Sequence, residues 1–210
     1  MIERNQVYNC DCMAGMAQMP DNYIDLAIVD PPYGIGNFSP SSGGAKVMTI
    51  KKRAYSWNES IPGDEYFTEL RRVSVNRVIW GANYYNVFES GGAIVWDKLK
   101  TNPKMSACEI ASYSGHNHVD KFTMQWLGLH NPDGETIHPC QKPVDLYRWL
   151  IHKYAKEGDL ILDTHVGSGS SIIACIDKGF DYIGYEIDAD YYKAMQERVY
   201  QFTRQTKLLY

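Results

Sequence analysis

Short apolar runs rich in β-branched residues alternate along this chain with segments of helical periodicity. The apolar runs cover residues 6–9, 26–29, 77–80, 93–96, 109–112, 119–124, 159–162 and 182–185. Apolar residues recur at helical spacing over residues 66–73, 143–155, 170–178 and 189–202. Alternating strands and helices predict an α/β protein with a mostly parallel twisted sheet and helices on both faces.

The length and the charge of the chain restrict its class. With 210 residues and 44% hydrophobic content, it is predicted to form one domain, residues 1–210, around one sizeable core. The net charge of -4 counts weakly against a large nucleic-acid footprint but allows a local basic patch. No apolar run reaches membrane-spanning length, and the first residues lack a signal-peptide pattern, so we expect a soluble cytoplasmic protein.

Five cysteines are scattered along the sequence. Their number is odd and no CxxC pair occurs, so we predict reduced thiols and neither a disulfide framework nor a zinc site. Cys10 and Cys12 would point to opposite sides of a strand end, which argues against joint metal binding. We therefore predict that the protein has no metal site.

The predicted strand at residues 26–29 ends abruptly at Asp30-Pro31-Pro32-Tyr33. Ligands of open α/β sheets bind at the carboxyl ends of the strands, so the Asp30 carboxylate should project into that crevice. The two prolines stiffen the backbone and donate no hydrogen bonds, which leaves only acceptors beside the flat face of Tyr33. Such an arrangement suits an exocyclic amino group on an aromatic ring. A simple turn in which Asp30 caps its own backbone is the alternative.

A glycine-rich turn follows the predicted strand at residues 159–162. Asp163 ends this strand, Gly167-Ser168-Gly169 forms the turn, and a helix follows. Glycines let a ligand approach the backbone, and a helix start offers unpaired N–H groups. About twenty residues further on, Glu186 ends another strand, a spacing that suits a ribose diol. An acid before the glycines favours a ligand with a positive end over a pyrophosphate, although NAD binding or a plain βαβ unit fits the same pattern.

A third stretch, His138-Pro139-Cys140-Gln141-Lys142-Pro143, leads into the predicted helix at residues 143–155. Pro143 suits the first turn of a helix. Taken alone, a histidine or lysine at such a place is more often a surface or capping residue than a catalytic one.

Together, the three stretches resemble the amino-group DNA methyltransferases that use S-adenosylmethionine. The tetrad DPPY, the stretch HPCQKP and the Asp-x-x-x-Gly-Ser-Gly turn stand in the order of the circularly permuted β-type members. The likeness is nearly continuous over residues 7–30 and 138–199, and the middle, with WGANYY and VWDK, is similar to small phage-type members. The resemblance implies a Rossmann-like class I methyltransferase fold, S-adenosylmethionine as cofactor, DNA as partner, and a bacterial or phage-infected cell.

The resemblance also implies catalytic roles for the tetrad. Asp30 and the Pro31 carbonyl would accept the two hydrogens of the target amino group, so that its lone pair is localised toward the methyl donor. Pro32 would keep the corner rigid and Tyr33 would stack on the base. In a duplex the base must be flipped out, or it must already be single-stranded. No covalent intermediate is needed, so no cysteine is expected to act as a nucleophile.

Further residues of the family pattern bind the cofactor. Asp11 would contact its adenine, Glu186 its ribose, and Asp163 would lie near its methionine end. The same pocket would be lined or closed by Gly167, Ser168, Gly169, Gln141 and Lys142. One departure concerns the usual Asp-Pro-Phe before the glycines, which reads Asp163-Thr164-His165 here, so the aromatic wall of the cofactor site is replaced.

The sequence has no room for the separate target-recognition domain of larger relatives. The segment at 36–62, predicted to be a mobile loop, and the stretch at 127–137 are the candidates for reading DNA. Phosphate contacts are predicted for Lys51, Lys52 and Arg53, and as a wider group for Lys98, Lys100 and Lys104, although each could be a solvated surface charge. A chain this short would read a brief site or form a homodimer.

More than one target base and more than one activity fit the sequence. Because the tetrad begins with Asp, we predict an adenine-N6-specific methyltransferase, with cytosine-N4 as the alternative. RNA or protein amide methyltransferases often show Asn-Pro-Pro-Tyr and place the cofactor half first, opposite to this chain. A non-catalytic methyltransferase-like subunit is a further alternative, against which the intact Asp30 argues.

Overall fold

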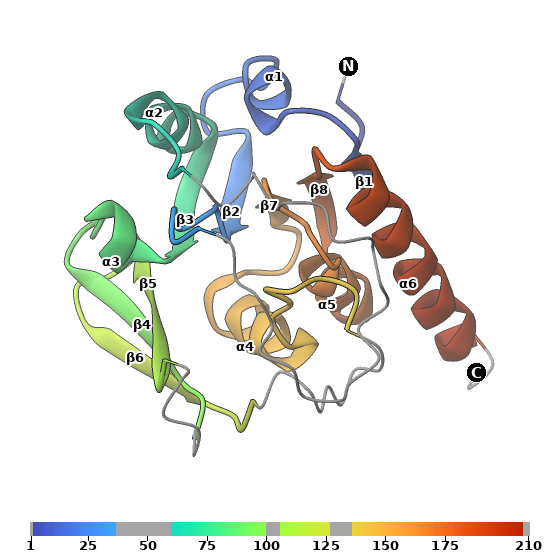
Figure 1. The fold of residues 1–210 in the computed structure, drawn as a ribbon. Coiled ribbons are helices and arrows are strands. Elements are labelled where there is room, and N and C mark those ends of the chain that lie inside the picture. Colours follow the sequence, from blue (N-terminus) through green and yellow to red (C-terminus); the bar gives the residue numbers. More distant parts are fainter. Residues whose placement is uncertain (1, 37–59, 100–105, 127–135, 208–210) are drawn as a thin grey trace.

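The structure, a computed structural model, describes residues 2–36, 60–99, 106–126 and 136–207 (Figure 1). The strands are β1 (Gln6–Tyr8), β2 (Ile24–Val29), β3 (Ser74–Trp80), β4 (Gly92–Asp97), β5 (Cys108–Tyr113), β6 (Val119–Thr123), β7 (Leu160–Asp163) and β8 (Asp181–Tyr185). The helices are α1 (Cys12–Met16), α2 (Asp64–Val73), α3 (Ala82–Tyr85), α4 (Val144–Tyr154), α5 (Ser170–Lys178) and α6 (Ala189–Lys207). The predicted loop at 36–62 lies mostly outside the described residues.

One eight-stranded sheet has the order β1-β8-β7-β2-β3-β5-β4-β6. Strand β5 is antiparallel to both of its neighbours, β3 and β4, and every other neighbouring pair is parallel. The predicted α/β class with a mostly parallel sheet is therefore confirmed. Each predicted strand is present, and each predicted helix has a counterpart, whereas the short helices α1 and α3 were not predicted.

Helices cover both faces of the sheet because the central strands are apolar on both faces (Figure 1). Along β2, Leu26 and Ile28 pack with residues of α4 and α5, whereas Ala27 and Val29 pack with residues of α1 and α2. Helix α6 packs on α5 through Met195. Among the described residues, no helix is long and apolar enough to cross a membrane.

The topology has a switch point between β2 and β7. From β7 the chain passes through α5 to β8 on one side, and from β2 it passes through α2 to β3 on the other side. The two connections therefore leave in opposite directions from neighbouring strands. Ligands of open α/β sheets bind at such a switch point, outside the carboxyl ends of the strands.

Candidate active site

Four acidic residues line one edge of the sheet. Strands β1, β8, β7 and β2 are neighbours and run parallel, so their carboxyl ends lie at the same edge. Asp11 follows β1, Glu186 follows β8, Asp163 ends β7, and Asp30 follows β2. The acids predicted from separate stretches of sequence are thus brought into one row, and its last two members, Asp163 and Asp30, flank the switch point.

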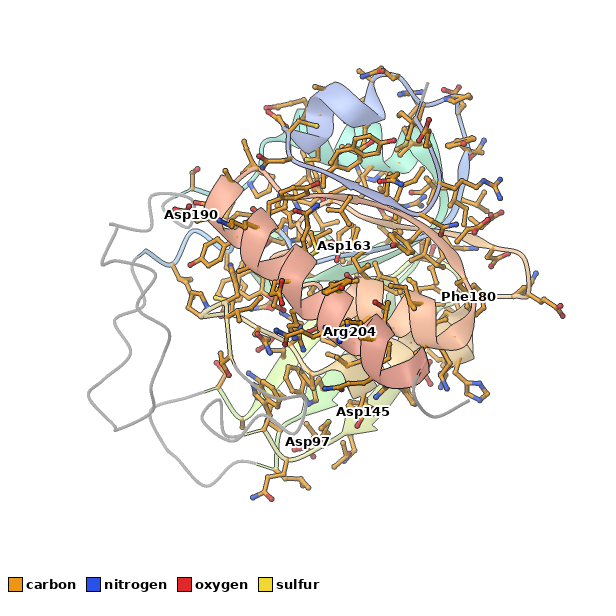
Figure 2. All side chains as sticks on the ribbon, turned by 90° about the vertical axis from the view of Figure 1, so that its right-hand side faces the viewer. Asp97, Asp145, Asp163, Phe180, Asp190 and Arg204 are labelled. Atoms are coloured by element: carbon orange, nitrogen blue, oxygen red, sulfur yellow. The ribbon has the colours of Figure 1, made fainter. Side chains whose placement is uncertain are left out.

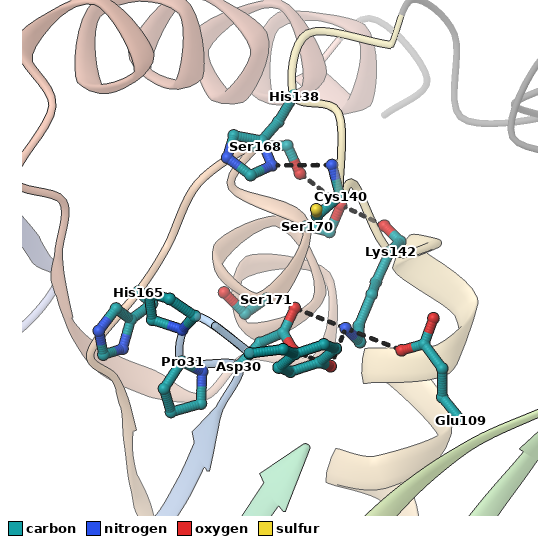
Figure 3. Close-up of polar contacts among 12 residues, drawn as sticks. Asp30, Pro31, Glu109, His138, Cys140, Lys142, His165, Ser168, Ser170 and Ser171 are labelled. Carbon is teal, nitrogen blue, oxygen red and sulfur yellow. Dashed lines mark hydrogen bonds and ion pairs between the residues drawn. The ribbon is translucent and has the colours of Figure 1, made fainter. Parts of the chain in front are cut away.

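The Asp30 carboxylate is held by two donors (Figure 3). The Tyr33 hydroxyl donates to Oδ1 at 2.5 Å, and the Lys142 ammonium donates to Oδ2 at 2.5 Å. Lys142 also donates to the Tyr33 hydroxyl oxygen at 3.1 Å and is only 5% exposed. The side chain of Lys142, predicted to close a cofactor pocket, is therefore directed at the tetrad.

Glu109, at the start of β5, was not predicted as part of this site. Its Oε2 lies 3.0 Å from Lys142 Nζ, and its Oε1 accepts a hydrogen bond from Lys98. Burial alone would raise the pKa of Glu109, but Lys142 and Lys98 lower it to about 2. Burial would lower the pKa of Lys142, but Asp30 and Glu109 raise it. The only hint in the sequence is a charge inside an otherwise strand-like run.

The predicted role of Lys98 needs a correction. It was grouped with the lysines predicted to contact phosphate, yet its side chain is buried and paired with Glu109. Together with Asp30, Glu109 and Lys142 it forms a buried quartet of two carboxylates and two ammonium groups, whose formal charges cancel. Lys51, Lys52, Arg53, Lys100 and Lys104 lie outside the described residues.

The stretch WGANYY packs around the aromatic residue of the tetrad. Gly81 has φ +77, and a Cβ there would lie 2.3 Å from the Tyr33 ring, so only glycine fits. Tyr84 stacks on Tyr33 with 4.7 Å between ring centroids. The Tyr85 hydroxyl donates to the carbonyls of Pro31, at 2.5 Å, and Pro32, at 3.0 Å. A hollow of about 80 Å³ lies beside the stacked rings and reaches Glu109.

Asp163 is buried at the start of the glycine-rich turn. It is 2% exposed and lies well inside the molecular outline in Figure 2. Ser171 Oγ donates to it at 2.5 Å, and the backbone N–H of His165 donates at 2.9 Å. Burial raises the pKa of Asp163 to about 7, against these hydrogen bonds, and the negative charge of Asp30 adds to the rise. This carboxyl group therefore titrates near neutral pH.

Glu186 closes the same turn from β8. It accepts hydrogen bonds from the backbone N–H groups of Gly167 and Asp188, each at 2.8 Å. Its side chain is largely buried, and burial raises its pKa. A carboxylate has about four acceptor sites, so two remain for the hydroxyl groups of a ligand.

The turn itself is fixed by helix α6 and by the 138–143 stretch. Arg198 donates to the Ser168 carbonyl at 2.8 Å, and a Cβ on Gly169, at φ +79, would lie 2.7 Å from Met195. Ser170 Oγ donates to the Lys142 carbonyl at 2.7 Å. These contacts hold the HPCQKP stretch against the start of α5 (Figure 3).

Gln141 lies buried between these elements. Its Oε1 accepts from the backbone N–H of Ile137 at 3.1 Å, while its buried Nε2 has no hydrogen-bond partner among the described residues. An unpaired buried donor is costly, so Gln141 is suited to hold an acceptor group of a ligand. Its place at the edge of a cofactor pocket stays a prediction.

Asp11, the first member of the row, lies close enough to the residues after β7 to influence His165. Asp11 is exposed and caps α1, accepting from the Met13 N–H at 2.9 Å. Burial lowers the pKa of the His165 ring to about 4, and the negative charge of Asp11 acts in the opposite direction. Thr164 Oγ1 lies 2.9 Å from His165 Nδ1 and 2.7 Å from the Tyr66 hydroxyl. Thr164 and His165 therefore place a buried, hydrogen-bonded imidazole directly after β7.

Comparisons with known proteins point to one family. The model of the DNA methylase family N6_N4_Mtase matches residues 85–197, more than half of the chain. The putative methylase YubD of Escherichia coli (strain K12) is 27% identical over 208 residues, covering 90% of this chain and 87% of that protein. The type II methyltransferase M2.MboI of Moraxella bovis is 24% identical, covering 94% of this chain and 88% of that protein.

Solved structures of methyltransferases share the fold. The M1.HpyAVI–SAM complex superposes with a TM-score of 0.59 at 20% identity, over 94% of this chain and 100% of that one. The cytosine-N4-specific PvuII DNA methyltransferase gives a TM-score of 0.63 at 13% identity, over 97% of this chain and 92% of that one. At these identities the likeness concerns the Rossmann-like fold alone.

Proposed function

Since the chain belongs to the N6/N4 DNA methylase family, we propose that it transfers a methyl group from S-adenosylmethionine to the exocyclic N6 amino group of adenine in DNA. The observation that supports this most is the row of acids at the carboxyl ends of β1, β8, β7 and β2. It sets three acceptors beside a glycine-rich turn and a fourth, Asp30, on the rigid tetrad next to them.

The residues present fit S-adenosylmethionine. Glu186 keeps acceptor sites for the two ribose hydroxyl groups, and the buried Asp163 lies where a positive amino-acid end would be neutralised. Gln141 offers an unpaired buried donor, and Asp11 an exposed acceptor. When bound, S-adenosylmethionine supplies an electrophilic methyl group.

The tetrad prepares the amino group of the base. Its nitrogen is a poor nucleophile because the lone pair is delocalised into the ring. We propose that Asp30 and the Pro31 carbonyl accept its two hydrogens, which localises the lone pair and stabilises the developing positive charge. Tyr33, Lys142 and Tyr85 already donate to these groups, yet each oxygen retains an acceptor site, so the amino group can bind without displacing them.

The base is proposed to enter either flipped out of a duplex or from a single strand. Tyr33 would stack on it, at roughly 1–3 kcal/mol for a base on an aromatic ring. We propose that residues 36–62 and 127–137 read the DNA, with Lys51, Lys52 and Arg53 on the phosphates. A homodimer would extend the footprint.

The proposed base can be tested by product analysis. Unmethylated DNA is incubated with the protein and S-adenosylmethionine, digested to nucleosides and analysed by mass spectrometry. We expect N6-methyldeoxyadenosine, which must be absent with the Asp30→Ala variant. N4-methyldeoxycytidine instead would favour the second candidate, cytosine-N4 methylation. Cofactor binding by calorimetry without any methylated base would favour a non-catalytic subunit.

Replacing Glu186 by Gln should weaken cofactor binding. The amide keeps the shape but loses the charge and one acceptor oxygen, and hydrogen bonds to charged groups contribute about 1.5–3 kcal/mol. The Kd of S-adenosylmethionine, measured by titration calorimetry, should therefore rise by about 10- to 100-fold. Glu197→Gln, an exposed acid on α6, is the matched control. An unchanged Kd for Glu186→Gln would remove Glu186 from the cofactor site.

Cofactor affinity should also depend on pH through Asp163. In the free protein, the raised pKa of Asp163 means that the fold favours the protonated carboxyl group. The stability that this group contributes to the folded state is present below the usual carboxyl pKa and is lost as pH rises through about 7. A positively charged ligand favours the carboxylate, so affinity should increase by up to about tenfold in all between pH 6 and pH 8. Asp163→Asn should flatten this profile. A profile that is identical in both proteins would contradict the assignment.

A further inference from the structure

We propose a second, independent site: His116, His118 and Asp120 bind a divalent transition-metal ion of the zinc type. The three residues lie at alternate positions of the β5–β6 connection and the start of β6. Their ligand atoms all lie within 4.8 Å of one another.

The three side chains converge on one carboxylate oxygen. His116 Nε2 lies 2.9 Å from Asp120 Oδ2, and His118 Nε2 lies 3.7 Å from the same oxygen. The two imidazole rings are stacked, with centroids 3.6 Å apart, and both Nε2 atoms lie on the side of Asp120 Oδ2. His118 is 63% exposed, so its ring can tilt toward an ion shared with His116 and leave a position open to water. Two imidazoles and one carboxylate form a ligand set that zinc accepts.

Neighbouring residues hold this carboxylate without blocking it. Lys153 Nζ donates to the other oxygen, Oδ1, at 2.5 Å, and the Tyr154 hydroxyl donates to Oδ2 at 2.7 Å. Hydrogen bonds of this kind orient metal-binding carboxylates in proteins.

The backbone around His116 is fixed as well. The His116 ring packs edge-on against Tyr113, with 4.7 Å between ring centroids. The backbone carbonyl of His116 packs so closely on Gly92 that a Cβ at that glycine would lie 2.1 Å from the carbonyl oxygen. With metal on Nε2 the ring proton moves to Nδ1, which is buried and has no hydrogen-bond partner among the described residues. This unpaired donor lowers the affinity, so we expect micromolar binding.

The site is remote from the tetrad. Strand β6 is parallel to β4, and β4 runs in the same direction as β3 and β2, so the start of β6 lies at the edge opposite Asp30. Helix α4 begins beside Lys142 and ends at Tyr154, about 16 Å away along its axis at 1.5 Å per residue. The ion would therefore fasten the β5–β6 connection to the start of the edge strand β6 and take no part in methyl transfer.

The test is a metal titration of tag-free, chelator-treated full-length protein. Calorimetry with Zn²⁺ should give one site of micromolar Kd, and Mg²⁺, which prefers oxygen ligands, should not compete. His118→Ala should weaken Zn²⁺ binding by at least about tenfold. His152→Ala, an exposed histidine on α4, is the matched control and should not change it.

Cobalt distinguishes this site from the cysteines. The Co²⁺ complex should show visible d–d bands of nitrogen and oxygen ligation without a thiolate charge-transfer band. Zn²⁺ should also raise the melting temperature of the parent protein and leave that of His118→Ala unchanged. No Zn²⁺ binding, equal binding by His118→Ala, or a thiolate band would each overturn the proposal. These measurements need neither DNA nor methyl transfer, so they stand apart from the proposed activity.

Discussion

Replacing Asp30 by Ala is expected to reduce kcat for methyl transfer by at least about 10²–10³-fold, the typical loss when one preorganised stabilising group is removed from an active site. The reason is geometric. Asp30 Oδ1 and Oδ2 are held by Tyr33 and Lys142, so the carboxylate is fixed before any base arrives. Removing it takes away the acceptor that localises the amino lone pair.

Cofactor binding should survive this change. Asp30 follows β2, whereas the proposed cofactor contacts come from other segments, namely the residue that caps α1, the 138–143 stretch, the ends of β7 and β8, and the turn after β7. The Kd of S-adenosylmethionine should therefore stay near that of the parent in calorimetry, while single-turnover transfer to radiolabelled DNA is lost. Asp21→Asn, an exposed acid at the other end of β2, should retain full activity. Substantial transfer by Asp30→Ala would contradict the catalytic role of the tetrad.

The parts of the site that could be predicted are those with a local signal. An acid that ends an apolar run is visible in the sequence, so Asp30, Asp163 and Glu186 could be identified before their strands were known to be neighbours. A glycine pair before a helix is equally local. The short helices α1 and α3, with 5 and 4 residues, were missed because so short a segment shows no periodicity.

The electrostatic support of the site could not be predicted, because it depends on pairing between distant segments. Lys142 and Glu109 are 33 positions apart, and Glu109 and Asp30 are 79 apart, yet the lysine lies between the two acids. No spacing rule relates strand ends on β2 and β5 to a residue just before α4. The same applies to Tyr85, whose hydrogen bonds to the carbonyls of Pro31 and Pro32 arise only when α3 folds over the tetrad.

These donors also change the hydrogen-bonding character of the tetrad. In the sequence it offers only acceptors, whereas in the folded protein these acceptors already hold Lys142, Tyr33 and Tyr85 as donors. The buried quartet of Asp30, Glu109, Lys142 and Lys98 is neutral overall, so the two lysines balance the two carboxylates without adding a net charge at the switch point.

Replacing Lys142 by Met should therefore produce the largest loss of stability. The change leaves two carboxylates facing one remaining cation, Lys98, in a buried site. Breaking a buried ion pair from one side typically costs about 3–5 kcal/mol of the free energy of unfolding. Urea unfolding monitored by circular dichroism should show this loss, whereas Lys193→Met, an exposed lysine on α6, should change little. A loss no larger than that of the control would mean that Lys142 does not bridge the acids.

The pH dependence of this loss has a definite sign. In the parent protein, Lys142 and Lys98 outweigh burial and keep the pKa of Glu109 at about 2. Without Lys142, burial is opposed by Lys98 alone, so the pKa of Glu109 in the folded state must rise. In the parent protein, the stability that this low pKa contributes is present above the usual value of 4.5 and is lost as pH falls through about 2. The Lys142→Met defect should accordingly be larger at pH 7 than at pH 3.

A second substitution separates charge from packing. In Lys142→Met the quartet has a net charge of -1, and adding Asp30→Asn returns it to zero while leaving the Glu109–Lys98 pair intact. If electrostatics causes the loss, the double variant should recover most of the unfolding free energy and lose its pH dependence, although it cannot methylate DNA. Contacting residues that form one network are coupled in such double-mutant cycles by about 0.5–3 kcal/mol. Purely additive losses would show instead that Lys142 stabilises the protein through the packing of its aliphatic stem and not as the cation shared by Asp30 and Glu109.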